Sequence, residues 1–311
     1  MAVEFPVTEA EKGQRLDVFL SSKTCLTRSQ ITKLLKDAHI SLNGQILRHG
    51  CKIRPGDIAA VDFQQPQDDQ LIPQDIEIGI CYEDKHLIVV DKPPGMPMYP
   101  AAGHSSGTLM NAVKWRVETL APVGGPLRPG VVHRIDKDTS GLVVIALDGP
   151  SYYSLVEQFK GRSIKRRYLA LIYGSMMASK GEITLPIGRS QSDRKKMSTR
   201  SNRHKPAITH WQTLKTFRGA SLVEAVLATG RTHQIRVHFS AVGHPVLGDR
   251  TYGLKTSVEH GKIPIPRQML HAATLGFVHP VTGQYLEFAS PLPADMNNTC
   301  SLLEAQCYNK K

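Results

Sequence analysis

The hydrophobic pattern of the chain is organised around residues 131–147. A short apolar pair, Val131 and Val132, precedes a polar cluster, and a continuous apolar run from Leu142 to Leu147 follows it. This layout predicts two buried strands joined by a loop. The loop, residues 133–141, holds two acids, two hydroxyls and a glycine beside its basic residues. It is too polar for a core, and loops of this kind often carry function.

Before this stretch, residues 13–63 have the pattern of a small separate unit. Apolar spacing predicts a helix from residue 15 and a second helix, capped by Thr27 or Ser29, that carries Ile31 and Leu35 on one side. Asn43-Gly44 predicts a hairpin, and a short strand follows at 58–63. Basic side chains form the other side of the second helix, namely Arg28, Lys33 and Lys36.

Residues 64–75 are rich in Gln, Asp and Pro and contain no Lys or Arg, which predicts a linker. We therefore expect a second domain over residues 76–298 and a short tail over 299–311. Within that domain the pattern predicts helices at 108–120 and 151–159, a strand at 165–174 and a polar, basic loop at 189–205, which includes Lys195 and Lys196. Strands and helices do not alternate regularly, so we expect an α+β fold with a mixed, largely antiparallel sheet.

The composition indicates what kind of partner the protein binds and in which compartment it works. The 311 residues carry 39 Lys and Arg against 27 Asp and Glu, a net charge of +12, which favours nucleic acid over membrane as partner. The five cysteines are scattered without a CxxC pair, which indicates a reducing compartment. The N-terminus resembles no secretory signal, and no window is apolar enough to span a membrane. We expect a cytoplasmic protein.

The candidate chemistry lies in the loop. An Asp at the mouth of a buried sheet can act as nucleophile or general base, although a lone Asp is more often a turn cap. Asp136 stands out because Arg134 lies two residues before it and a second basic segment holds Arg231. An Arg near 4 Å attracts a carboxylate by about 4 kcal/mol at an effective dielectric of 20, which keeps it ionised.

Other site classes fit poorly. His233, His238 and His244 lack HExxH spacing, and the arginines among them would repel a metal ion, so we expect none. The sequence contains no GxxxxGK[ST], GxGxxG or GxSxG motif, which argues against a nucleotide cradle and a serine nucleophile elbow.

Four ordered blocks resemble one family. HRIDKDTSG at 133–141 resembles the HRLD-x-x-TSG signature of the RluA-type pseudouridine synthases, with Ile135 in place of Leu. Residues 83–95, 165–174 and 227–249 resemble further motifs of that family, so the resemblance covers residues 76–298. Residues 13–63 resemble the α-L RNA-binding domain first known from a small-subunit ribosomal protein. That domain in front is typical of the RluD and RluC branch, and the KKM…KPAITH segment at 195–210 is more similar to RluD.

The resemblance implies a pseudouridine synthase fold with a central cleft and an isomerase of uridine in RNA that needs no cofactor. It implies Asp136 as the catalytic carboxylate, paired with Arg231. Arg134 would fill the space left by a flipped nucleotide, and Tyr168 would stack on the target base. The second helix (Arg28, Lys33, Lys36) and the basic loop (Lys195, Lys196) would contact RNA.

We expect a monomer that acts on large-subunit ribosomal RNA without an obligatory protein partner. Two departures concern the choice of uridine: Tyr99 stands where the RluD branch usually has His, and His204 where a Gly is common. Two alternatives remain open at this point. One is a tRNA pseudouridine synthase, and the other is an RNA-binding or ribosome-assembly factor without activity.

Overall fold

The computed structural model describes residues 2–24, 26–63, 70–101, 103–193, 196–254, 259–260 and 263–308. The chain forms two compact units, residues 1–69 and 70–311. The division falls inside the stretch whose composition predicts a linker. In the described part of the chain, no helix has the length and apolarity needed to cross a membrane.

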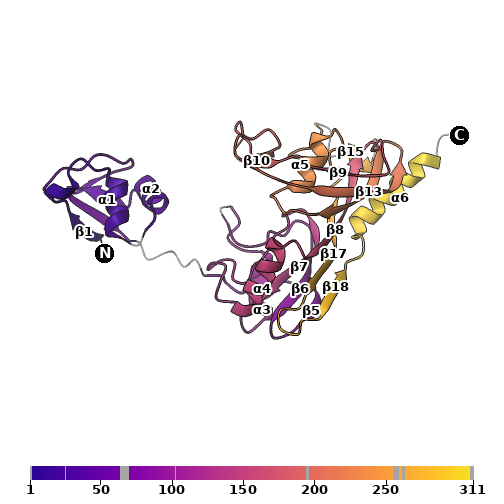
Figure 1. Cartoon of the computed structure of the whole chain (residues 1–311), viewed down its shortest axis with the longest axis horizontal. Helices are drawn as coiled ribbons and strands as arrows, with labels where there is room; N and C mark the ends of the chain where they lie inside the picture. Colours follow the sequence, from indigo (N-terminus) through magenta and orange to yellow (C-terminus); the bar gives the residue numbers. More distant parts are fainter. Residues whose placement is uncertain are drawn as a thin grey trace. The chain divides into compact units, whose positions relative to one another are not determined.

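The N-terminal unit packs two helices with a four-stranded antiparallel sheet (Figure 1). The helices are α1 (Leu16–Lys23) and α2 (Arg28–Lys36), preceded by the short 3-10 helix η1 (Glu9–Glu11). The sheet has the order β1-β4-β2-β3, with β1 at Ala2–Pro6, β2 at Ile40–Leu42, β3 at Gln45–Ile46 and β4 at Ile58–Asp62. The core of the unit brings together Leu16, Phe19 and Leu20 of α1 with Ile31 and Leu35 of α2.

Local chemistry explains these elements. Thr27 caps α2, because its hydroxyl accepts from the N–H of Gln30 while the Gln30 side chain accepts from the N–H of Thr27. Asn43 and Gly44 both have left-handed backbones, at φ 51° and 77°, as a two-residue hairpin requires. The helix and hairpin predictions are confirmed here. Strand β1, which pairs along β4, was not predicted and lies before residue 13.

The C-terminal unit is built on a mixed sheet that has nine strands within the described residues. Its order is β5-β6-β7-β17-β8-β14-β13-β9, with β18 paired to β17. The pairing of β7 with β17 is parallel and the others are antiparallel. The strands are β5 (Gly79–Glu83), β6 (Leu87–Lys92), β7 (Ser140–Ala146), β8 (Lys165–Tyr173), β9 (Lys180–Ile183), β13 (Thr209–Phe217), β14 (Ala220–Leu227), β17 (Leu270–Val278) and β18 (Tyr285–Ala289). The expected α+β fold with a mixed, largely antiparallel sheet is confirmed.

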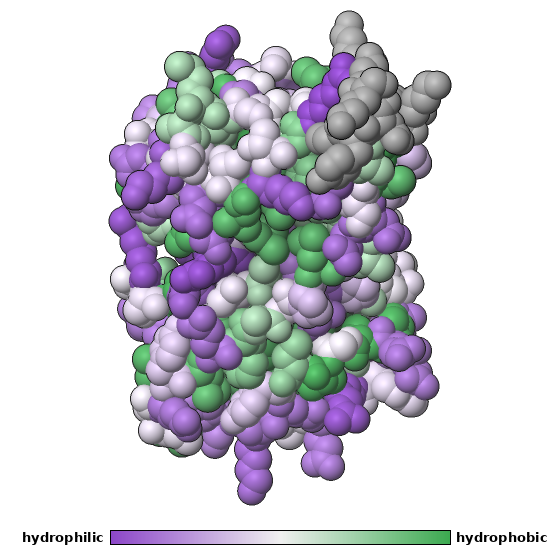
Figure 2. All heavy atoms as spheres, turned by 90° about the vertical axis from the view of Figure 1, so that its right-hand side faces the viewer, coloured by the Kyte–Doolittle hydropathy of each residue, from purple (hydrophilic) through white to green (hydrophobic). Residues whose placement is uncertain are grey.

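Four helices within the described residues pack on this sheet (Figure 1): α3 (Leu109–Arg116), α4 (Gly149–Lys160), α5 (Gln234–Ala241) and α6 (Ala294–Tyr308). Helix α3 begins after its cap Thr108, as predicted, but ends at Arg116 instead of Leu120. Most of α6 lies in the segment for which the sequence predicted a tail. It is a helix because Met296, Cys300 and Leu303 recur at helical spacing and are buried in a core cluster. On the face that Figure 2 shows, groups of apolar residues lie among polar ones.

The central stretch differs from its prediction on one side. Strand β7 is buried at all seven positions, because its alternate side chains enter two different core clusters. This two-sided burial explains the continuous apolar run. No strand forms at Val131 and Val132 in the described residues; Val131 makes only an isolated bridge to Ile145. Residues 131–139 are therefore an irregular segment that leads into the strand.

The predicted loop at 189–205 contains a small sheet of short strands, and most of its described residues lie outside those strands. Strand β10 (Ile187–Arg189) pairs on one side with β11 (Met197–Ser198) and on the other with β12 (His204–Lys205). Because these pairings satisfy the backbone of a polar segment, the charge-rich composition did not prevent structure here. A further two-stranded pairing joins β15 (Glu259–His260) to β16 (Ile263–Pro264).

Candidate active site

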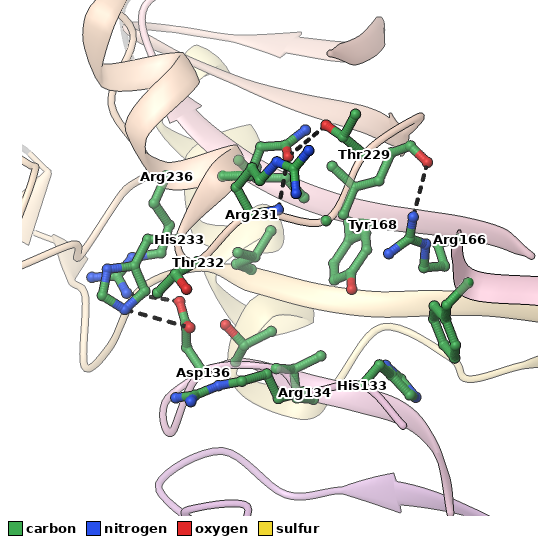
Figure 3. A pocket seen from close by; sticks show the side chains of 18 of the residues that line it. His133, Arg134, Asp136, Arg166, Tyr168, Thr229, Arg231, Thr232, His233 and Arg236 are labelled. Carbon is green, nitrogen blue, oxygen red and sulfur yellow. Dashed lines mark hydrogen bonds and ion pairs between the residues drawn. The ribbon is translucent and has the colours of Figure 1, made fainter. Parts of the chain in front are cut away.

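A pocket of about 560 Å³ opens in the C-terminal unit. It collects the 132–139 segment, the end of α4, the start of β8 and residues 227–236 (Figure 3). Six basic side chains and one carboxylate, that of Asp136, line it; the basic ones are Arg134, Lys160, Arg162, Arg166, Arg231 and Arg236. Such an excess of positive charge suits an anionic ligand.

Asp136 is held by Arg236 of helix α5. Its Oδ2 accepts from Arg236 Nη1 at 2.8 Å, and its side chain keeps 16% of its surface exposed. The other edge of the guanidinium is taken by Asp249, which accepts from Nε at 2.7 Å and from Nη2 at 2.9 Å. Arg236 is therefore fixed by a bidentate pair with a buried carboxylate, and its third nitrogen, Nη1, donates to Asp136.

The charges in this chain of groups support one another. Burial opposes the ionisation of Asp249, but the hydrogen bond and charge of Arg236, with the N–H groups of Tyr252 and Thr251, hold the pKa of that carboxyl below its usual value. Burial alone would lower the pKa of Arg236, yet its two carboxylate neighbours raise it. Asp136 consequently faces a guanidinium that stays charged across the accessible pH range.

His233 lies on the other side of Asp136. Its Nε2 is 3.6 Å from Asp136 Oδ1, and its Nδ1 is 2.7 Å from the Tyr252 hydroxyl. The residue is in the left-handed region at φ 57° and forms the N-cap of α5. Burial lowers the pKa of His233, although the charge of Asp136 acts in the opposite direction. A neutral imidazole at this position leaves Arg236 as the cation that balances Asp136.

The predicted partner of Asp136 was wrong. Arg231 lines the pocket, but its Nε donates to the Pro206 carbonyl at 3.1 Å, and within the described residues no bond joins it to Asp136. Arg231 lies in the turn before α5, whereas Arg236 lies in the helix. The two arginines are five residues apart in one basic segment, so the sequence alone did not distinguish them.

Tyr168 and Arg134 occupy the expected region. Tyr168 on β8 is 8% exposed and lines the pocket, and burial raises the pKa of its phenol. Arg134 is exposed, and its Nη1 donates to the Tyr99 hydroxyl at 2.7 Å. The Arg134 guanidinium also lies 5.5 Å from the centre of the Tyr99 ring, and Arg128 lies 5.9 Å from it. Tyr99 thus holds Arg134 at the pocket.

Two groups, the buried Lys92 and the half-buried His133, brace the segment that carries Asp136. The ammonium of Lys92 donates to the carbonyls of Pro93 at 2.8 Å, Met96 at 2.9 Å and Lys137 at 2.9 Å, so it ties the end of β6 to the residue after Asp136. Burial lowers the pKa of Lys92 to about 7. His133 accepts from the Val144 N–H at 3.0 Å through Nε2 and stacks on Phe159 at 4.7 Å. These contacts fix the segment against the sheet.

The remaining predicted RNA contacts lie apart from the pocket residues in sequence. In the N-terminal unit, Arg28 donates to Asp17, with Nη2 at 2.7 Å, while Lys33 and Lys36 are exposed on α2. In the C-terminal unit, Lys196 is half-buried, and its backbone carbonyl accepts from the Ser190 N–H. Lys195 lies outside the described residues.

Comparison with known proteins places the chain. Residues 86–241 match the family model of RNA pseudouridylate synthases, and residues 14–58 match the S4 domain. This protein belongs to the RNA pseudouridylate synthases and is an isomerase of that family. Within the family it is RluD-like. It is 42% identical to the ribosomal large subunit pseudouridine synthase D of Zymomonas mobilis over 93% of this chain and 94% of that protein. It is 39% identical to the protein of that name from Pseudomonas aeruginosa, over 94% and 92%.

A solved structure supports the fold. The human RNA pseudouridylate synthase domain containing 1 superposes on 78% of this chain and 98% of its own, with a TM-score of 0.58 and 26% identity. The fold, the family and the branch that the sequence predicted are confirmed by these likenesses.

Proposed function

We propose that this protein isomerises specific uridines of large-subunit ribosomal RNA to pseudouridine, with Asp136 as the catalytic carboxylate. The observation that carries the proposal is the Asp136–Arg236–Asp249 chain at a pocket whose other charged side chains are cations. A carboxylate works as nucleophile or base only when it is ionised, and Asp136 has a charged hydrogen-bond partner in Arg236.

The remaining pocket residues fit a base that has left its stack. Base extrusion costs a few kcal/mol, and stacking on an aromatic ring returns about 1–3 kcal/mol per base. Tyr168 supplies the ring. Arg134 is exposed and oriented by Tyr99. Its guanidinium fills the gap that the base leaves and forms hydrogen bonds with the RNA there.

We also propose that the unit at 13–63 docks on RNA through α2 and that 64–75 links it to a catalytic domain at 76–298. The exposed Lys33 and Lys36 make the phosphate contacts, with Lys195 and Lys196 contributing from the C-terminal unit. In this proposal the protein acts as a monomer in the cytoplasm without an obligatory protein partner.

The direct test uses purified full-length protein and RNA labelled with tritium at uridine C5, which loses the label to water on isomerisation. We expect release from 23S ribosomal RNA, none with Asp136→Asn or Asp136→Ala, and unchanged RNA binding by both variants. Release from tRNA alone would assign the other substrate class. Binding without release by the wild-type protein would indicate a non-catalytic RNA-binding factor.

A further inference from the structure

Arg166 is a buried cation of the pocket that has no part in the reaction as proposed so far. It lies on β8 two residues before Tyr168, so both side chains point to the same side of the strand. Arg166 is 8% exposed and lines the pocket. Arg167 between them points to the other side, where it is half-exposed and lies 3.5 Å from Glu224.

The guanidinium of Arg166 is poorly satisfied. Of its five N–H donors, Nη2 makes one long bond of 3.4 Å to the Leu227 carbonyl, and Nε has no hydrogen-bond partner among the described residues. Nor does any carboxylate pair with it in that part of the chain; its guanidinium lies 5.4 Å from the centre of the Phe159 ring. A buried charge without a counter-ion is costly, which indicates that a ligand supplies the missing acceptor.

The backbone opposite makes room for this group. A Cβ added to Gly230, which also lines the pocket, would lie 2.8 Å from Arg166 Nη1. Any side chain at 230 would therefore displace the guanidinium. In Figure 3, Tyr168 lies between Asp136 and Arg166, and both charges act on the Tyr168 phenol.

We propose that Arg166 binds a carbonyl oxygen, O2 or O4, of the target pyrimidine while that base stacks on Tyr168. This inference rests on the proposed function. A carbonyl of the base is favoured over an RNA phosphate because Arg166 is only 8% exposed and lies two residues from the stacking ring of Tyr168 on the same side of β8. A phosphate stays in the strand at the pocket mouth, whereas the extruded base alone reaches inward.

The chemistry gives such a contact a purpose. In the isomerisation the N1–C1′ bond breaks and its electron pair leaves with the base. The C5–C1′ bond then forms, C5 loses its proton to water and N1 gains one, so atoms and charge balance. While the base is detached, its negative charge rests largely on the carbonyl oxygens, where a buried guanidinium stabilises it.

Kinetics separate this role from a structural one. In the full-length protein, Arg166→Met should lower the single-turnover rate at saturating RNA by about tenfold or more, because a hydrogen bond to a charged group is removed. The salt dependence of RNA affinity should not change, because no phosphate contact is removed. Gly230→Ala should act in the same direction, and Arg167→Met is the matched control that should not. Replacing the target uridine with 2-thiouridine or 4-thiouridine should lower the single-turnover rate of the wild-type protein. The rate of Arg166→Met, which is already low, should not fall further.

An activity-independent measurement uses protein labelled with ¹⁵N at arginine Nε. The Arg166 resonance, assigned by its disappearance in Arg166→Met, should shift with uridine 5′-monophosphate and stay in place with ribose 5-phosphate. A shift with both would make the site a phosphate site, and a shift with neither would leave no ligand; either result overturns the proposal. So does a normal rate in Arg166→Met. Wild-type protein that releases no tritium from any RNA contradicts the proposed function instead, and the resonance still decides the role of Arg166.

Discussion

Arg236 connects Asp136 to Asp249 through a single guanidinium. It donates to Asp136 at 2.8 Å from Nη1, while Nε and Nη2 are taken by Asp249 at 2.7 and 2.9 Å. Asp249 is fully buried and receives two further backbone N–H groups, from Thr251 and Tyr252. The position of the candidate catalytic carboxylate therefore depends on the Arg236–Asp249 pair. Arg236 lines the pocket, whereas Asp249 lies behind it.

This relationship separates the two arginines of the segment. Arg236→Lys should lower the isomerisation rate by about two orders of magnitude, because a lysine cannot bond both carboxylates in the same geometry. Arg231→Lys should keep the rate constant for chemistry, since Arg231 bonds the Pro206 carbonyl. Single-turnover tritium release with both variants checks this. Equal reductions in the two would contradict the assignment of Arg236 as the partner of Asp136.

Tyr99 gives a second prediction. Tyr99→Phe removes the hydroxyl that bonds Arg134 at 2.7 Å but keeps the ring. It should lower the single-turnover rate by an amount that corresponds to about 0.5–1.5 kcal/mol in activation free energy. Arg134→Ala should cost more. In the double variant the two effects should not add, because both act through one guanidinium. A double-mutant cycle of single-turnover rates measures this, and full additivity would argue against Tyr99 as the group that positions Arg134.

His133 predicts a pH dependence of stability. Burial, with the charge of Arg166 as a smaller cause, lowers the pKa of His133 in the folded state below its ordinary 6.5. The unfolded chain therefore binds a proton that the folded one excludes, and stability decreases as pH falls below about 6.5, by at most about 1.4 kcal/mol per pH unit.

Urea unfolding of the wild type and His133→Gln at several pH values isolates this term. Glutamine does not titrate but can still accept the Val144 N–H. The variant should lose less stability between pH 6.5 and pH 5 than the wild type. Parallel curves for the two proteins would show that His133 does not titrate on unfolding.

These sites show what the sequence could and could not predict. Elements marked by local chemistry, such as the Thr27 cap and the Asn43-Gly44 turn, were predictable because their determinants are neighbours in the chain. The identity of the Asp136 partner was not, because it depends on where α5 begins and on Asp249 fixing Arg236. The lack of a counter-ion for Arg166 among the described residues likewise depends on tertiary packing. Helix α6 was predictable in principle, since Met296, Cys300 and Leu303 already repeat at helical spacing.

The exposed lysines of α2 predict a salt effect. Lys33→Gln with Lys36→Gln should weaken RNA binding uniformly and reduce the slope of log affinity against log salt by about 0.7–0.9 for each phosphate that the lysines no longer neutralise. Lys12→Gln, an exposed lysine outside α2, is the control. Filter binding between low and moderate salt measures the slope. An unchanged slope in the double variant would remove α2 from the RNA interface.

The proposed catalytic role of Asp136 in modifying ribosomal RNA is tested most directly by mapping pseudouridines in total RNA from cells that lack this protein. The same cells are compared after complementation with the wild-type chain and with Asp136→Asn. We predict that particular positions of 23S ribosomal RNA lack pseudouridine in its absence, regain it with the wild type and remain uridine with Asp136→Asn. Restoration of those positions by Asp136→Asn would contradict the proposed function, as would an unchanged ribosomal RNA map in the cells that lack the protein.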